Sequence, residues 1–152
     1  AQQKTIPIVN YNDPVSDEEN RKMELAIRRS HGDQVVECVD NDETAAVIAN
    51  LVHAKKLVLM TSTEGIYRDP ADPKTLVEQV TAKSMEELEE KVRQLQESCV
   101  GASRAGANGA KAKLEYALKS ARQGTMVIIG HARHRLSDLV EGRVACTRIG
   151  LE

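Results

Sequence analysis

Aromatic residues are nearly missing from this chain, which has three Tyr, no Phe and no Trp among its 152 residues. Proteins that bind single-stranded nucleic acid stack bases on aromatic side chains, and this chain has too few of them to favour that class. An excess of positive charge is lacking too, because 21 Lys and Arg stand against 23 Asp and Glu, for a formal net charge of -2. A strong field that attracts nucleic acid or an anionic membrane is thereby excluded.

Paired cysteines and long apolar runs are lacking as well. Cys38, Cys99 and Cys146 are odd in number and far apart, with no Cys-x-x-Cys motif and no paired His that would complete a zinc site. They predict reduced thiols and a cytoplasmic protein without a structural metal. No apolar run reaches the roughly 18 residues that span a bilayer, and no signal peptide is recognisable, so we expect no membrane partner.

What is present is the composition of a folded domain, with 41% hydrophobic and 29% charged residues. Short apolar runs predict strands at 5–10, 34–39, 56–61, 125–130 and 143–150. Helical patterns with caps or glycine stops predict helices at 16–32, 42–54, 84–100, from the 101–106 region to Gly124, and 135–142. Strand, helix and strand between 34 and 61 form a βαβ unit, which implies a parallel sheet with a right-handed crossover. The fold class is therefore α/β.

Two segments have more detailed signals. Residues 64–75, EGIYRDPADPKT, are rich in Gly, Asp and Pro and predict an excursion made of turns. Ser84 and Glu87 form a capping box at the start of the 84–100 helix. Four apolar residues of that helix recur at helical spacing and predict its buried stripe: Met85, Leu88, Val92 and Leu95.

Acids and amides cluster after two predicted strands. The first cluster is Asn10, Asn12 and Asp13, and the second is Asp40, Asn41 and Asp42. Ligands of open parallel sheets bind beyond the carboxyl ends of strands, so both clusters are candidates for ligand contacts. The alternative is that they form Asx turns and cap helices, with Asp42 as the cap of the helix that follows.

A third candidate is the segment 104–113, RAGANGAKAK, in which a glycine-containing loop enters a helix. Glycine lets backbone N–H groups approach phosphate oxygens, while a helix N-terminus and a lysine stabilise negative charge. The alternative is that Lys111 and Lys113 are solvated charges on the helix surface. Residues 131–135, HARHR, have no companion ligands at metal spacing, and we interpret them as a solvated loop.

These motifs, in this order, resemble the amino acid kinase family, and among its branches the glutamate 5-kinases most closely. The resemblance is carried by IPIVNYNDPVS (6–16), VDNDETAAVIANLVHAKKLVLMTSTEGIYRDP (39–70), GANGAKAKLEYA (106–117) and RVACTRIG (143–150). It implies a three-layer α/β/α sandwich with a mainly parallel sheet. It also implies transfer of the γ-phosphoryl group of ATP to a small carboxylate substrate such as glutamate, with Mg²⁺ bridging the phosphates.

The resemblance also implies roles for individual residues. Asp42 matches an acid that orients catalytic lysines, and Lys113 matches a lysine that stabilises the moving charge. Residues that match the substrate side are Asn10, Asn12, Asp13, Asp40 and Asn41. Residues that match the nucleotide side are Thr61, Ser62, Gly65, Tyr67, Gly106, Gly109 and Lys111.

The resemblance covers only the C-terminal part of the family's domain. We expect residues 1–152 to be one partial domain, in which 1–42 supply acceptor-side loops and 43–152 the nucleotide-binding portion. The N-terminal part, with its first glycine loop and a second catalytic lysine, is expected upstream of Ala1 or on a partner chain. The resemblance further implies a homo-oligomer.

Two alternative functions stay open. A kinase of a phosphorylated acceptor, similar to uridylate kinases, requires extra positive charge and is favoured if arginines of the 16–35 segment face the site. A nucleotide-binding sensor without turnover is compatible with Ser62, which stands where the family has Asp, and with Ala107 and Asn108, which interrupt the second glycine loop. Turnover by the full-length protein separates a sensor from a kinase.

Overall fold

A computed structural model describes residues 41–99 and 107–152 of the chain. The chain divides into two compact units, Ala1–Thr44 and Ala45–Glu152, and each is described by itself. The predicted strands at 5–10 and 34–39 and the predicted helix at 16–32 lie outside the described residues.

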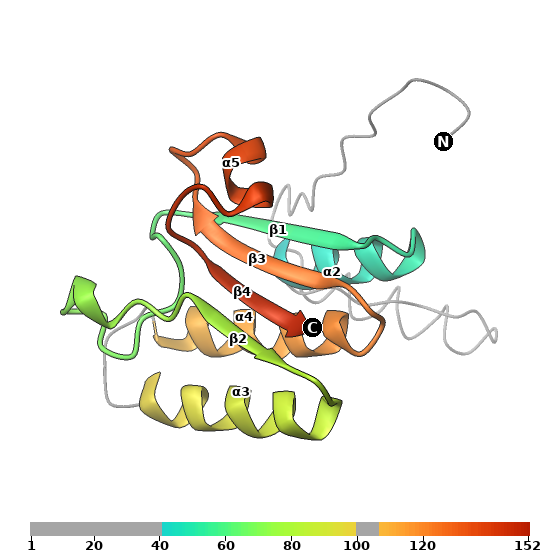
Figure 1. Cartoon of the computed structure of the whole chain (residues 1–152), viewed down its shortest axis with the longest axis horizontal. Helices are drawn as coiled ribbons and strands as arrows, with labels where there is room; N and C mark the ends of the chain where they lie inside the picture. The colour runs from blue at the N-terminus through green and yellow to red at the C-terminus, as the bar shows by residue number, and fades with distance from the viewer. Residues whose placement is uncertain (1–40, 100–106) are drawn as a thin grey trace, which may run out of the picture. The chain divides into compact units, whose positions relative to one another are not determined.

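Four strands form one sheet in the second unit (Figure 1). They are β1 (Lys56–Thr61), β2 (Gln79–Ala82), β3 (Met126–His131) and β4 (Thr147–Leu151), in the spatial order β1-β3-β4-β2. β1 pairs with β3 in parallel and β2 pairs with β4 in parallel, whereas β3 and β4 are antiparallel. The predicted mainly parallel sheet is confirmed, with one antiparallel pairing at its centre.

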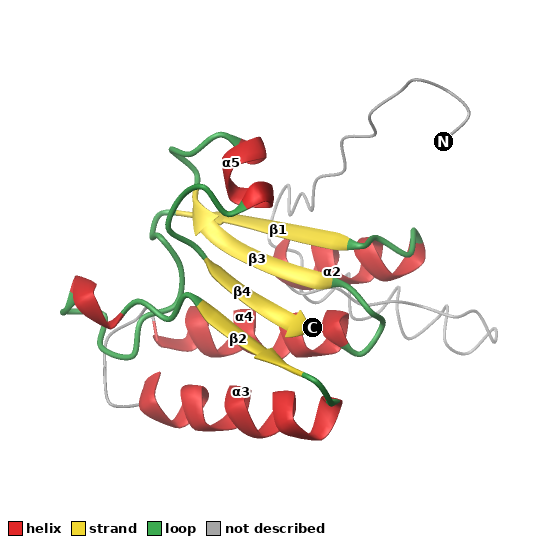
Figure 2. Ribbon diagram, in the orientation of Figure 1, coloured by secondary structure: helices red, strands yellow, loops and turns green. Residues whose placement is uncertain are grey.

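Helices cover both faces of this sheet (Figure 2). The described helices are α2 (Asn41–Leu51), α3 (Met85–Cys99), α4 (Ala107–Ala121) and α5 (Leu136–Glu141), with a 3₁₀ turn at Pro73–Thr75. α3 and α4 pack against each other and against β2, β3 and β4 on one face, while Leu139 of α5 packs on the opposite face. Within this unit the predicted α/β/α layering is confirmed.

Strand β3 shows why the layers form. Its residues Val127, Ile128 and Ile129 are all fully buried. Successive side chains of a strand point to opposite faces, so Val127 and Ile129 join the core under α3 and α4, while Ile128 joins Leu139 on the other side. A continuous apolar run is typical of a central strand that is covered on both faces.

Helix α3 follows its sequence pattern closely. The Glu87 backbone N–H donates to the Ser84 hydroxyl at 3.2 Å, which confirms the predicted cap, and the Glu87 carboxylate accepts from the Lys83 N–H at 3.4 Å. The hydrogen bond from Lys91, together with the one from the Lys83 backbone, holds the pKa of Glu87 below its usual value. The predicted stripe is confirmed, because Leu88, Val92 and Leu95 are buried and Met85 packs against them.

Two features differ from the sequence prediction. Strand β2 was not predicted, because it is only four residues long, QVTA, and only Val80 and Ala82 of these are buried. Helix α4 begins at Ala107, so Gly109 lies in its first turn and not in the preceding loop. Gly124 has a positive φ of 80° after α4, as a helix stop requires. No helix within 41–99 or 107–152 has the length and apolar character needed to cross a bilayer.

Helix α5 provides a matched test of the core. Leu139 is fully buried, whereas Leu136 on the same helix is 55% exposed. We expect Leu139→Ala to lower the free energy of unfolding by about 2 to 5 kcal/mol, since it leaves a cavity under β3. Leu136→Ala should change it by less than about 0.5 kcal/mol. Urea unfolding of the full-length protein measures both, and equal effects would contradict the assigned faces of α5.

Candidate active site at the carboxyl edge

The carboxyl ends of β1 and β3 meet at one edge of the sheet. The two strands pair in parallel from Lys56 and Met126 to Thr61 and His131. One more backbone bond, from the Ala132 N–H to the Thr61 carbonyl at 2.8 Å, continues the ladder past the strand ends. Ligands of open α/β sheets bind beyond this kind of edge. This carboxyl edge, defined as the ends of β1 and β3 and the turns that leave them, is the candidate site.

Helix α4 also begins at the carboxyl edge. It ends at Ala121 and is joined through Gly124 to the start of β3, so it runs antiparallel to β3 and its first turns lie where β3 ends (Figure 1). Lys111 is exposed and Lys113 is half-buried, both in the second turn of the helix. The positive end of the helix dipole and two lysines make this place suitable for an anionic group.

Hydroxyl groups shape the turn that leaves β1. The Thr61 hydroxyl accepts from the Thr63 backbone N–H at 3.1 Å and donates to the Thr63 carbonyl at 2.9 Å. The Thr63 hydroxyl donates to the Gly65 carbonyl at 3.1 Å. Ser62 lies between them and is exposed. Local side-chain hydrogen bonds of this type hold a turn in one shape, which fixes the backbone of Ser62 at the edge.

Gly65 has a packing reason to be glycine. A Cβ atom at this position would lie 2.3 Å from the Thr147 hydroxyl and 2.9 Å from the Thr147 backbone nitrogen. The same Thr147 hydroxyl, fully buried at the start of β4, accepts from the Ile66 N–H at 2.8 Å. The turn after β1 is therefore pressed onto β4.

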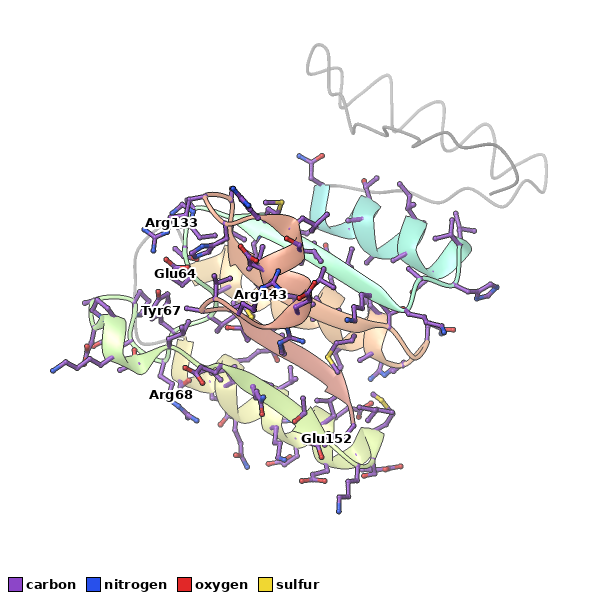
Figure 3. All side chains as sticks on the ribbon, turned by 45° about the horizontal axis from the view of Figure 1, so that its top comes forward. Glu64, Tyr67, Arg68, Arg133, Arg143 and Glu152 are labelled. Carbon is purple, nitrogen blue, oxygen red and sulfur yellow. The ribbon has the colours of Figure 1, made fainter. Side chains whose placement is uncertain are left out.

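The predicted excursion of turns follows directly. Tyr67 forms an isolated antiparallel bridge with Leu76, and the Val77 N–H donates to the Ile66 carbonyl at 2.8 Å. The carboxylates of Asp69 and Asp72 accept from backbone N–H groups two residues further on, at 2.9 Å each. Figure 3 labels Tyr67 and Arg68 on this excursion, with Tyr67 nearer to Glu64 in the view and Arg68 farther from it. The excursion carries the chain across to β2 at the other side of the sheet.

One cluster at the carboxyl edge was missed by the sequence analysis. The Glu64 carboxylate contacts two side chains of the turn after β3. Oε1 pairs with Arg133, which Figure 3 shows beside it, and Oε2 lies 2.6 Å from Nε2 of His134. The interpretation of residues 131–135 as a solvated loop is wrong for His134, whose side chain is only 20% exposed. The sequence did contain a signal for this cluster, namely an acidic residue after one parallel strand and basic residues after the neighbouring strand.

The predicted nucleotide-side residues within the described part belong to elements that end or begin at the carboxyl edge. They are Thr61, Ser62, Gly65, Tyr67, Gly109 and Lys111, and the predicted catalytic Lys113 belongs with them. Asn41 and Asp42 lie in the first turn of α2, within the other unit, where an acid is favourable to the helix dipole. The remaining predicted residues lie outside the described residues: Asn10, Asn12, Asp13, Asp40 and Gly106.

The carboxyl edge offers positive charge to an anionic ligand. Within 41–99 and 107–152, no group of three His, Cys, Asp or Glu is placed to hold a metal ion. Mg²⁺ is commonly bound through one or two carboxylates together with substrate phosphates. Lys111 and Lys113, in the first turns of α4, offer positive charge to phosphate groups.

Comparison with known proteins points to one family. The model of the amino acid kinase family matches residues 1–131. Glutamate 5-kinase of Geobacillus kaustophilus is 33% identical over 149 residues, covering 96% of this chain and 34% of that protein. Acetylglutamate kinase of Methanopyrus kandleri is 46% identical over 59 residues, covering 39% of this chain and 24% of that protein. These matches confirm the resemblance to the family and to its glutamate 5-kinases.

A solved structure shares the fold. Carbamate kinase from Giardia lamblia, bound to AMP-PNP, superposes with a TM-score of 0.56 at 19% identity, covering 79% of this chain and 36% of that one. The expected α/β fold is confirmed by this likeness. The chain spans about a third of the length of the curated glutamate 5-kinases it matches, 34% of the one from Geobacillus kaustophilus.

The two motif glycines should respond differently to alanine. Gly65→Ala forces a methyl group into Thr147 and should lower the free energy of unfolding by about 1 to 3 kcal/mol. A Cβ at Gly109 meets nothing within 4 Å, so Gly109→Ala should raise stability by about 0.5 kcal/mol through better helix propensity. Urea unfolding of the two full-length variants tests this, and a tolerated Gly65→Ala would contradict the contact with β4.

Proposed function

The chain belongs to the amino acid kinase family, and on this premise we propose that the whole protein transfers the γ-phosphoryl group of ATP to a small carboxylate such as glutamate. The 33% identity to a glutamate 5-kinase over nearly the whole chain supports this acceptor class. The observation that carries the proposal is the carboxyl edge, where motif residues from the turn after β1 and from the start of α4 come to one side of the sheet.

Phosphoryl transfer asks a protein chiefly for positioning and for stabilisation of charge. In this proposal Lys113, half-buried on α4, stabilises the charge that moves onto the leaving phosphate. Asp42 orients the catalytic lysines. With Mg²⁺ bound to ATP, part of the charge of the phosphates would be neutralised, which would leave the rest to these lysines.

The proposal divides the remaining residues into two sides. Residues 43–152 form the nucleotide portion, and 1–42 supply the acceptor loops with Asn10, Asn12, Asp13, Asp40 and Asn41. The nucleotide side consists of Thr61, Ser62, Gly65, Tyr67, Gly106, Gly109 and Lys111. Three further expectations stay predictions. They are an upstream segment or partner chain that supplies a second lysine, a homo-oligomer, and a cytoplasmic location.

A nucleotide-binding module without turnover is the second candidate. Two observations favour it: Ser62 is exposed at a place where the family motif has an acid, and Gly109 lies inside a helix instead of a phosphate-binding loop. The uridylate kinase-like alternative depends on arginines of the 16–35 segment, which lie outside the described residues. Calorimetric titration of the full-length protein with Mg-ATP, beside an assay of transfer to glutamate, separates the first two, because a sensor binds without transfer.

Lys113 and Lys119 on α4 form a matched pair for a mutational test. Lys119 lies further along the helix, where it pairs with Glu115 at 3.4 Å and lies over the ring of Tyr116. Lys113→Ala should lower kcat of the full-length enzyme about a hundredfold, because a charge that stabilises the transition state is lost. Lys119→Ala should leave kcat within about twofold, since an exposed pair contributes little. Equal effects on kcat would count against the role given to Lys113.

A further inference from the structure

The Glu64 carboxylate joins the two turns of the carboxyl edge. Oε1 pairs with Arg133 and Oε2 lies 2.6 Å from Nε2 of His134, so each oxygen has its own partner. Both partners come from the turn after β3, whereas Glu64 belongs to the turn after β1. From this geometry we infer that Glu64 is a positioning residue for the nucleotide, one that acts by holding the two turns together. The inference rests on the proposed function and deepens it.

Burial distinguishes the contact between Glu64 and His134 from an ordinary surface ion pair, although the side chain of Arg133 is 64% exposed. The side chains of Glu64 and His134 are 16% and 20% exposed, whereas those of Glu87 and Lys91 in α3 are 50% and 45% exposed. Exposed pairs contribute little, because water and salt screen them. A carboxylate that is mostly withdrawn from water must keep its charged or hydrogen-bonding partners, so its position is coupled to theirs.

The backbone on both sides of the cluster is already fixed. Beside Glu64, the Thr63 hydroxyl donates to the Gly65 carbonyl, and Gly65 is pressed against Thr147. In the other turn, the Arg133 N–H donates to Nδ1 of His131 at 3.1 Å, and the His134 N–H donates to the His131 carbonyl at 3.0 Å. Each turn is thus held in shape by its own contacts, and the Glu64 carboxylate connects one turn to the other.

Thr61 and Ser62 are the residues through which the position of Glu64 affects nucleotide binding. These two residues precede Glu64 in the same turn and are assigned to the nucleotide side. The sheet ladder holds the strands only as far as the bond between Ala132 and Thr61. Beyond that bond, the Glu64 carboxylate links the turn of Ser62 directly to the turn of His134. If the charge of Glu64 is removed, the link between the two turns weakens, and ATP must restore their arrangement at a cost to its affinity.

The test uses the full-length protein, with Glu64→Gln, His134→Gln and the double variant. Glu89→Gln is the matched control, because Glu89 also joins two elements through an arginine, Arg122 at 2.8 Å, but at the far end of α4. We expect Glu64→Gln to weaken Mg-ATP binding, measured by calorimetry, about fivefold, and to raise KM for ATP with little change in kcat. Glu89→Gln should leave both within about twofold.

The double variant shows whether Glu64 acts through its partner. Because Glu64 and His134 form one contact, we expect the double variant to bind Mg-ATP no worse than Glu64→Gln alone. Unchanged binding by both single variants, with binding by the wild type, would overturn the inference and leave the proposed function intact. Tighter binding by Glu64→Gln would also overturn it, since it would mean that freed Arg133 holds the phosphates. A wild-type protein that does not bind Mg-ATP would overturn the proposed function and this inference together.

Discussion

The parallel pairing of β1 with β3 is the interaction on which the rest of this structure depends. It aligns Thr61 with His131, so two chain segments that are distant in sequence finish at the same edge. It also directs the turns that follow, because each leaves the sheet at a defined place and in a defined direction. The glycine contact on Thr147, the Glu64 cluster and the first turns of α4 all lie where that pairing ends.

The elements with strong periodic patterns could be predicted from sequence. α3 followed from a capping box and a stripe of Leu88, Val92 and Leu95, and β3 followed from an apolar run too short for a helix. Strand β2 could not be predicted in this way. Its residues QVTA have little hydrophobicity of their own, and they are held in the sheet by pairing with β4, which lies about 70 residues further along the chain.

The residues of the candidate site also fall into those that a local sequence pattern indicates and those that depend on distant parts of the chain. Local motifs pointed to Thr61, Gly65 and Lys113, but they did not give the physical reason for each residue. At Gly65 that reason includes close packing on Thr147, which no local pattern contains. Glu64 and His134 are 70 residues apart, and only the register of β1 and β3 brings them into contact. A property that depends on the register of distant strands cannot be read from residue spacing within one segment.

The strand order has a consequence for how the chain acquires its structure during synthesis. Every pairing in the described sheet involves β3 or β4, which follow β1 and β2 along the chain, while β1 and β2 lie at the outside. A growing chain that has reached the end of α4 holds both outer strands but neither of their neighbours. Contacts between residues so far apart in sequence form slowly. Until its neighbour has been synthesised, an apolar strand can form non-native contacts. This sheet can therefore form only after both β3 and β4 have been synthesised.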